Sequence, residues 1–157
     1  MFLGGYLCGR LMRPDPEPKR VHEALGATIR GGWGSPNPIF RHFFTSVFMP
    51  DATHDVAASF DELQRIATSP TNALRLWDMN ARLDVTELAK TIRVPTLVLH
   101  CKSDRVTPVE ESRRMARVIP SASFVELPGN NHVLLAGTPA FDHFFIEATN
   151  FLAMHDR

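Results

Sequence analysis

Apolar residues along this 157-residue chain change their spacing near residue 93. Between residues 15 and 92 they recur three and four positions apart, which predicts amphipathic α-helices. Four helices are expected to start where a capping residue or a proline follows a break in this spacing. These starts are Asp15-Pro16, Asn37-Pro38, Thr53 and Ser69-Pro70. A fifth, short helix reaching Ile92 is expected from Asp84 and Glu87, which have the spacing of a capping box.

From residue 93 onward, short runs of β-branched residues and leucine alternate with helical patterns. Residues 96–100 predict a buried parallel strand, and residues 123–127 predict a second strand. A capping box at Thr107-Pro108-Val109-Glu110 predicts the start of a helix after the first strand. Thr138-Pro139 predicts the start of a helix after the second strand. The last helix is expected to bury one face, made of Phe141, Phe144, Phe145, Ala148, Phe151 and Leu152. This order predicts a βαβα unit of a parallel sheet.

Together these patterns predict an α/β protein with a few-stranded parallel sheet flanked by helices and an all-helical block. A further short strand is expected over residues 2–7. The expected regions are 1–14, a core strand and linker; 15–92, the helical block; and 93–157, the βαβα segment.

Composition narrows the classes of protein. Lysine plus arginine balance aspartate plus glutamate at 17 each, so the basic surface typical of nucleic-acid binding is not expected. Hydrophobic residues make up 44%, which excludes a disordered chain, and two cysteines are too few for a disulfide framework. No segment approaches the roughly 18 apolar residues of a membrane span. We expect a cytoplasmic protein with no cofactor and no membrane partner.

Two candidate catalytic residues follow the two strands of the βαβα segment. Asp104 comes just after the first strand and His132 just after the second, so both are expected at one edge of the sheet. A carboxylate there can orient an imidazole that serves as general base and then general acid. Each residue alone is more simply a turn aspartate or a surface histidine, and only their pairing favours chemistry. Five other histidines are expected to be polar surface residues without a catalytic role: His22, His42, His54, His143 and His155.

The chain resembles a known family over residues 84–152. The runs D-V-T-E-L, R-V-P-T-L-V-L-H, D-x-x-x-P and P-G-N-N-H are similar to the C-terminal portion of α/β-hydrolase-fold proteins. The resemblance implies a partial α/β-hydrolase fold, with Asp104 as the acid, His132 as the base and residues 15–92 as a cap over the substrate pocket. The runs GGYxxGR, GWGSPNPxFR and FDELQRxATSP resemble the hydrolase-like domains attached to some bacterial regulators and cyclase-like signalling proteins.

Two departures from this family concern the nucleophile and one turn. The nucleophile motif G-x-S-x-G does not occur, and by the resemblance it belongs to strands that would precede Met1. Cys101 stands where the family usually has glycine. Three weaker alternatives remain: Ser35 as nucleophile, Cys101 paired with His132, and a metal site made of His100, Asp104 and His132.

Two functions therefore compete. In the first, the chain supplies the acid and base for ester or amide hydrolysis, lacks the nucleophile, and is inactive alone. In the second, it is a non-catalytic module that binds a ligand or another protein. In either case a homodimer or a complementing chain is expected, because an exposed sheet edge and apolar helix faces favour association.

A small apolar ligand is a further candidate partner, since aromatic residues of the helical block could line a pocket. Aromatic residues at helical spacing, however, more often belong to the hydrophobic core.

Overall fold

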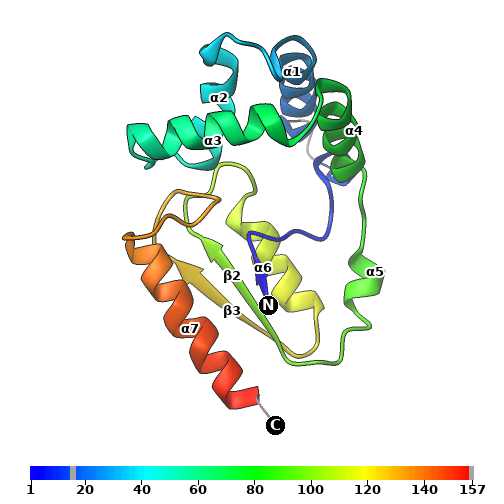
Figure 1. Cartoon of the computed structure of the whole chain (residues 1–157). Helices are drawn as coiled ribbons and strands as arrows, with labels where there is room; N and C mark the ends of the chain where they lie inside the picture. The colour runs from blue at the N-terminus through cyan, green and yellow to red at the C-terminus, as the bar shows by residue number, and fades with distance from the viewer. Residues whose placement is uncertain (15–16, 156–157) are drawn as a thin grey trace. The chain divides into compact units, whose positions relative to one another are not determined.

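The chain folds into two units in a computed structural model that describes residues 1–14 and 17–155 (Figure 1). The first, here called the sheet unit, consists of Met1–Leu7, Val47–Asp51 and Val85–Arg157. The second, the helical unit, consists of Cys8–Ser46 and Ala52–Asp84. The sheet unit thus gathers three separate parts of the sequence, and the short segment Val47–Asp51 reaches it from the middle of the helical block.

Three parallel strands form the centre of the sheet unit, in the order β1-β2-β3. Their bounds are Phe2–Leu3 for β1, Thr96–Cys101 for β2 and Ala122–Leu127 for β3. Every residue of β2 is buried, as expected for the middle strand of a parallel sheet. This parallel sheet confirms the predicted α/β fold class.

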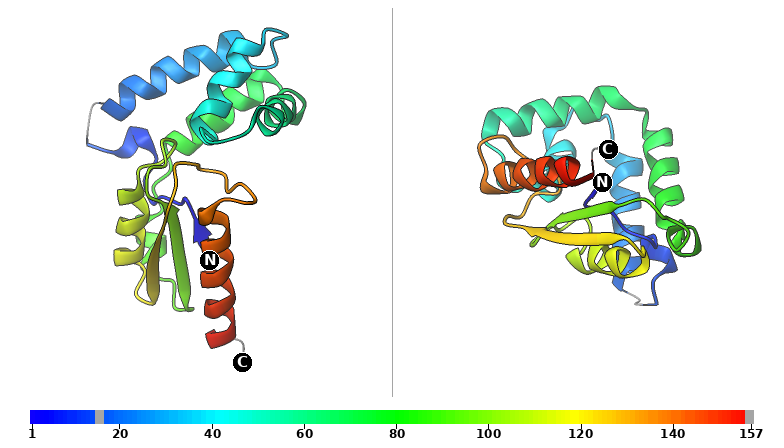
Figure 2. Two further views of the ribbon diagram at one scale, coloured as in Figure 1. Left: turned by 90° about the vertical axis from the view of Figure 1, so that its left-hand side faces the viewer. Right: turned by 90° about the horizontal axis from the view of Figure 1, so that it is seen from below.

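One helix covers each face of this sheet. Helix α6 (Val109–Val118) and helix α7 (Pro139–His155) lie on opposite sides of the strands, as Figure 2 shows, and short α5 (Thr86–Ala89) packs against α6. Successive residues of β2 therefore serve different layers. The core on the α7 side is made of Leu97, Leu99, Cys101, Leu127 and Ala140. His100 points the other way and contacts Ser112 of α6.

Two expectations about the sheet unit are wrong in detail. Strand β1 ends at Leu3 instead of Leu7, because Gly4 has a φ of +63° that turns the chain out of the extended conformation. In α7 the predicted face is rotated: Phe144 and Phe151 pack on the core, whereas Phe145 is 51% exposed and Leu152 is 55% exposed. The buried row is spaced four, four and three residues apart, at Ala140, Phe144, Ala148 and Phe151.

Four longer helices build the helical unit, except for Val47 and Phe48 at the end of the second, which belong to the sheet unit. Their bounds are Glu17–Gly32 for α1, Pro38–Phe48 for α2, His54–Ala67 for α3 and Pro70–Ala81 for α4. A single 3-10 turn, η1 (Arg10–Met12), precedes them, and α1 packs against α4. The Thr53 and Ser69 side chains cap α3 and α4 as predicted, by accepting backbone N–H groups. The cap predicted at Asp15-Pro16 lies outside the described residues.

Both predicted capping boxes are wrong. Asp84 pairs with Cys8 in an isolated antiparallel bridge, and α5 starts later, with Val85 at its N-cap. Helix α6 has Pro108 at its N-cap, because the backbone N–H of Thr107 is bound instead to the carboxylate of Asp104. Among the helices described, none has the length and apolar character that crossing a bilayer requires.

Candidate functional site

The structure brings Asp104 and His132 into contact at the carboxyl ends of β2 and β3. His132 Nδ1 lies 2.7 Å from Asp104 Oδ2. The other carboxylate oxygen, Oδ1, accepts the backbone N–H groups of Val106 at 2.7 Å and Thr107 at 3.2 Å. The turn that follows β2 thus fixes the carboxylate before the histidine meets it.

Asp104 is held as a carboxylate. Its side chain is only 1% exposed, and burial by itself would raise the pKa of this carboxyl. Hydrogen bonds from His100 and His132, the charge of His132 and the backbone N–H of Thr107 together outweigh burial and hold the pKa well below its usual range. Because the ionised carboxylate only accepts hydrogen bonds, His132 Nδ1 is assigned as the donor.

The second nitrogen of His132 is therefore the one available for proton transfer. Nε2 has no hydrogen-bond partner among residues 1–14 and 17–155, and the side chain is 24% exposed. The ring edge meets the ring of Phe48 at a centroid distance of 5.5 Å. A neutral imidazole protonated on Nδ1 and bare on Nε2 is the form that a general base requires.

Hydrogen bonds with the Val47–Asp51 segment hold the loop that carries His132. The carbonyl of Phe48 accepts the backbone N–H of His132 at 2.8 Å. Asn131, which is buried, accepts the N–H of Asp51 at 3.0 Å, and Asn130 donates to the Asp51 carboxylate at 3.1 and 3.2 Å. These contacts give a structural reason for both asparagines of the P-G-N-N-H run.

Gly4 packs directly against the pair. A Cβ added there would lie 3.0 Å from His132 Cε1 and 3.2 Å from its Nδ1, and the residue has a positive φ. Sequence reasoning missed Gly4 and Phe48. The pair of glycines that ends the first strand was an available signal for a close approach, whereas nothing in the sequence pointed from Phe48 to His132.

The weaker alternatives acquire structural roles. Cys101 faces the α7 core, and burial, followed by the charge of Asp104, raises its pKa to about 11, so its thiolate is scarce at neutral pH. Ser35 belongs to the helical unit, where its Oγ accepts the N–H of Asn37 at 3.1 Å, a local turn contact. Within the described chain, no group of three or more His, Cys, Asp or Glu residues is arranged to hold a metal ion.

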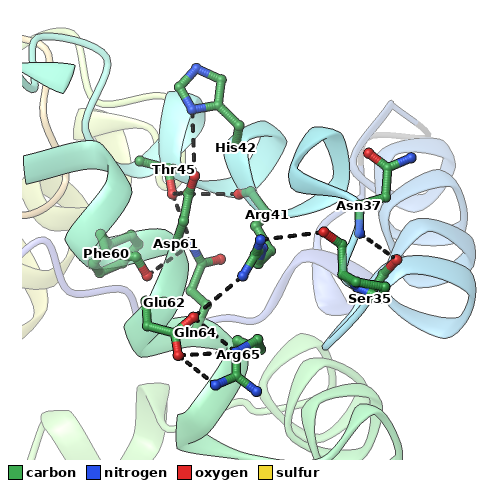
Figure 3. Close-up of polar contacts among 11 residues, drawn as sticks. Ser35, Asn37, Arg41, His42, Thr45, Phe60, Asp61, Glu62, Gln64 and Arg65 are labelled. Carbon is green, nitrogen blue, oxygen red and sulfur yellow. Dashed lines mark hydrogen bonds and ion pairs between the residues drawn. The ribbon is translucent and has the colours of Figure 1, made fainter. Parts of the chain in front are cut away.

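The helical unit has a cavity of its own between α2 and α3, with a volume of about 810 Å³. It is lined by Ile39, Arg41, His42, Phe43, His54, Ala57, Ala58, Asp61 and Glu62. Figure 3 shows the polar contacts beside it: Thr45 donates to the Asp61 carboxylate, and Gln64 donates to Thr45 at 2.8 Å. Two neighbouring phenylalanines of α2 have different surroundings: Phe43 lines this cavity, whereas Phe44 is buried against Trp33.

Comparisons with known proteins agree with this architecture. A model of the alpha/beta hydrolase family matches residues 3–141. Pyrrolizixenacetamide deacetylase of Xenorhabdus hominickii is 29% identical over 79 residues, which are 50% of this chain and 29% of the relative. L-allo-isoleucyltransferase of Pseudomonas savastanoi pv. glycinea is 32% identical over 76 residues, or 48% of this chain and 26% of the relative.

Among solved structures, the bromoperoxidase from Bacillus anthracis superposes with a TM-score of 0.73 at 22% identity. The match covers 97% of this chain and 56% of the bromoperoxidase. The chain thus spans just over half of this solved structure and aligns with less than a third of each of the two relatives.

Proposed function

Because the chain belongs to the α/β hydrolase family, we propose that it supplies the acid and the base of a hydrolase that cleaves ester or amide bonds. Asp104 is the acid and His132 the base. The observation that carries this proposal is the 2.7 Å contact between His132 Nδ1 and the buried Asp104 carboxylate, with Nε2 left without a partner in the described residues. The deacetylase named above acts on an amide, which supports this choice of bond.

In this mechanism His132 Nε2 takes the proton of a serine hydroxyl as the oxygen attacks the carbonyl carbon of the substrate. Asp104 keeps the Nδ1 proton in place and stabilises the imidazolium that forms. His132 then gives the proton to the leaving alcohol or amine, and an acyl-serine ester remains. Water repeats the sequence and releases the acid, so His132 acts as base and acid in turn.

We further propose that the serine comes from a segment or chain outside these 157 residues. The sequence has no G-x-S-x-G run. Ser112 of α6 is fully buried and donates to the carbonyl of Gly5, so it is unsuited to attack a substrate. Treating the chain alone with a fluorophosphonate should label no serine, and stoichiometric labelling would overturn this part of the proposal.

The acid–base role is tested by supplying the nucleophile separately. A second polypeptide carrying the elbow half of a serine α/β hydrolase is mixed with this chain, and hydrolysis of p-nitrophenyl acetate is followed. We expect turnover that falls about 100-fold or more with His132→Ala, because general acid–base catalysis is lost. His143→Ala, an exposed histidine of α7, is the matched control and should leave turnover unchanged. Association of the two polypeptides without any turnover would contradict the proposal.

A second candidate function, a non-catalytic module that associates through its sheet edge, is favoured by the exposure of β1. Phe2 and Leu3 are 40% and 38% exposed, and no strand of the described chain pairs with their outer edge. Next to β1 is an apolar cavity of about 360 Å³, whose walls include Leu7, Leu88 and Met115. Exposed apolar strand edges favour pairing with another chain.

We therefore propose a homodimer or a complementing chain at β1. Sedimentation at micromolar concentration should show a dimer, and Leu3→Lys should convert it to monomer, because a charge on an edge strand disfavours pairing. Val21→Lys, at a similarly exposed position of α1 in the helical unit, is the control. A wild-type monomer that also fails to bind the elbow polypeptide would contradict both kinds of association.

A small apolar ligand is the remaining proposed partner, and the cavity between α2 and α3 is its candidate site. Ile39 is 72% exposed and Phe43 is 41% exposed at this cavity, so apolar surface is accessible there. Fluorescence of 1-anilinonaphthalene-8-sulfonate should rise on binding and fall in Phe43→Ser. Unchanged fluorescence in Phe43→Ser would contradict this site.

A further inference from the structure

A third imidazole, His100, is buried beside the Asp104–His132 pair on the α6 side of the sheet. The residue has no exposed surface. Its Nε2 lies 3.0 Å from Asp104 Oδ2, the same oxygen that His132 contacts, and 2.9 Å from the carbonyl oxygen of Thr107. Its Nδ1 lies 2.7 Å from Ser112 Oγ. The mechanism above assigns no task to His100, although His100 contacts the acid directly.

Ser112 fixes the direction of the hydrogen bonds at one end of this network. Its Oγ is 2.8 Å from the carbonyl oxygen of Gly5, which can only accept a hydrogen bond. The single hydroxyl proton is used in that contact, so Ser112 can only accept from His100. Nδ1 of His100 must therefore carry a proton.

The opposite end of the network leads to the same result for Nε2. The Thr107 carbonyl and the Asp104 carboxylate are both acceptors, so Nε2 of His100 must also carry a proton and share it between them. A neutral ring would have one nitrogen without a proton, and the lone pair of that nitrogen would face a buried oxygen that also acts as an acceptor. With Nε2 bare, the lone pair would face both oxygens within 3.0 Å, and with Nδ1 bare, Ser112 would have to abandon Gly5.

A buried imidazolium needs a compensating charge, and Asp104 provides it. Asp104 is itself buried and its lowered pKa keeps it ionised. Glu126, the register partner of His100 on β3, is engaged in an ion pair with Arg113 of α6. The charge of His100 is thus matched by one carboxylate, which His132 shares.

We propose that His100 is a doubly protonated positioning residue that holds Asp104 Oδ2 in place for His132. The imidazolium binds carboxylate oxygen Oδ2, whereas the backbone of the turn after β2 binds Oδ1, and it takes part of the negative charge. His132 therefore meets an oriented acceptor with a reduced pull on its proton, which favours the neutral base. The catalytic consequence rests on the proposed function, whereas the protonation of His100 does not.

The protonation is measured directly on the 157-residue chain by long-range 1H–15N correlation of the seven histidine rings, with His100→Gln assigning the His100 signals. At pH 7 we expect both ring nitrogens of His100 to show the shifts of protonated imidazole nitrogen. A single unprotonated nitrogen in this ring would overturn the proposal. This result needs no nucleophile, so it is independent of any failure of the proposed hydrolysis.

Ser112→Ala tests the contact that fixes the Nδ1 proton. Loss of the hydroxyl should remove the Nδ1–H signal of His100 and leave Nε2–H. Ser59→Ala removes another helical hydroxyl bound to a backbone carbonyl, on α3 in the helical unit, and should leave His100 unchanged. Persistence of both protons in a folded Ser112→Ala would contradict the assigned role of Ser112.

The positioning role is tested at His132 itself. In His100→Gln the amide can still donate to Asp104 but the positive charge is gone, so the carboxylate attracts the His132 proton more strongly. The His132 Nδ1–H resonance should therefore move downfield, as a stronger charge-assisted hydrogen bond requires. A structural role alone would leave this resonance in place, and that outcome in a folded His100→Gln would refute positioning by His100.

Discussion

Each unit of the molecule contains an aspartate–histidine contact, and the two contacts are almost equally short. Asp104 and His132 of the sheet unit are 2.7 Å apart, and Asp78 and His22 of the helical unit are 2.9 Å apart. Burial is reversed between them. In the sheet unit the carboxylate is 1% exposed and the imidazole 24%, whereas in the helical unit the carboxylate is 50% exposed and the imidazole 10%.

This reversal decides what each histidine can do. The ring of His22 stacks on Trp77 at 5.4 Å, and its Nδ1 is buried with no hydrogen-bond partner in the described chain. No substrate proton can reach that nitrogen, while the exposed Asp78 is screened by water. His132 instead has its inner nitrogen fixed and its outer nitrogen available. A short Asp–His distance is therefore insufficient to indicate an acid–base pair. The carboxylate must also be buried and the imidazole partly exposed.

The largest expected difference between the two contacts is in stability. Asp104→Asn removes a buried charge that faces His100 and His132, and should lower the free energy of unfolding by on the order of 3 kcal/mol. Asp78→Asn should cost less than about 1 kcal/mol, since that pair is half exposed. Urea denaturation followed by circular dichroism measures both. Equal losses would show that burial order does not distinguish the contacts.

The same contrast predicts a dependence on pH. The pKa of Asp104 is lowered in the folded protein, so its contribution to stability is complete above the unfolded value of about 3.9 and is lost as pH falls through the folded value. The stability difference between wild type and Asp104→Asn should therefore be constant from pH 7 to about 5 and shrink in more acidic solution. Urea midpoints at a series of pH values give this difference, and a gap that widens in acid would contradict the sign.

Gly4→Ala should disturb the sheet-unit pair without changing any charge. The φ of +63° disfavours alanine, and the new Cβ would lie 3.0 Å from His132 Cε1, so we expect a loss of about 2 kcal/mol and a shifted His132 ring signal. Gly31→Ala is the matched control, because nothing lies within 4 Å of its Cβ position in α1. Alanine there should be neutral or stabilising. An unshifted His132 signal in Gly4→Ala would argue against close packing at Gly4.

The sequence correctly predicts the position of only one of these two aspartate–histidine contacts. The β2 and β3 patterns and the parallel order correctly place Asp104 and His132 at one sheet edge, because alternation and chain direction are local properties. The prediction that His22 lies on the polar surface is wrong, since the residue is 8% exposed. His22 is buried by α4, whose Trp77 lies 55 positions away in the sequence. The residues next to His22 in the sequence give no indication of this packing.

His100 illustrates the same limit within the site. In the sequence it is one residue of a buried run, and the pattern favours only a weak metal site together with Asp104 and His132. Its role depends on Ser112 and on the Gly5 carbonyl, which is 107 residues from Ser112 in the chain. The capping pattern at Thr107 failed for a related reason, because the carboxylate of Asp104 binds the backbone N–H of Thr107.

The smallest expected effect separates the two asparagines that hold the His132 loop. Asn131→Ala removes the buried side chain of Asn131 and its part-buried hydrogen bond with the backbone N–H of Asp51, and should cost about 1 to 2 kcal/mol. Asn130→Ala removes exposed bonds to the Asp51 carboxylate and should cost less than about 1 kcal/mol. Hydrogen exchange of the His132 amide, which donates to Phe48, should accelerate in Asn131→Ala more than in Asn130→Ala. The reverse order would mean that the exposed contact, and not the buried one, keeps the base next to Asp104.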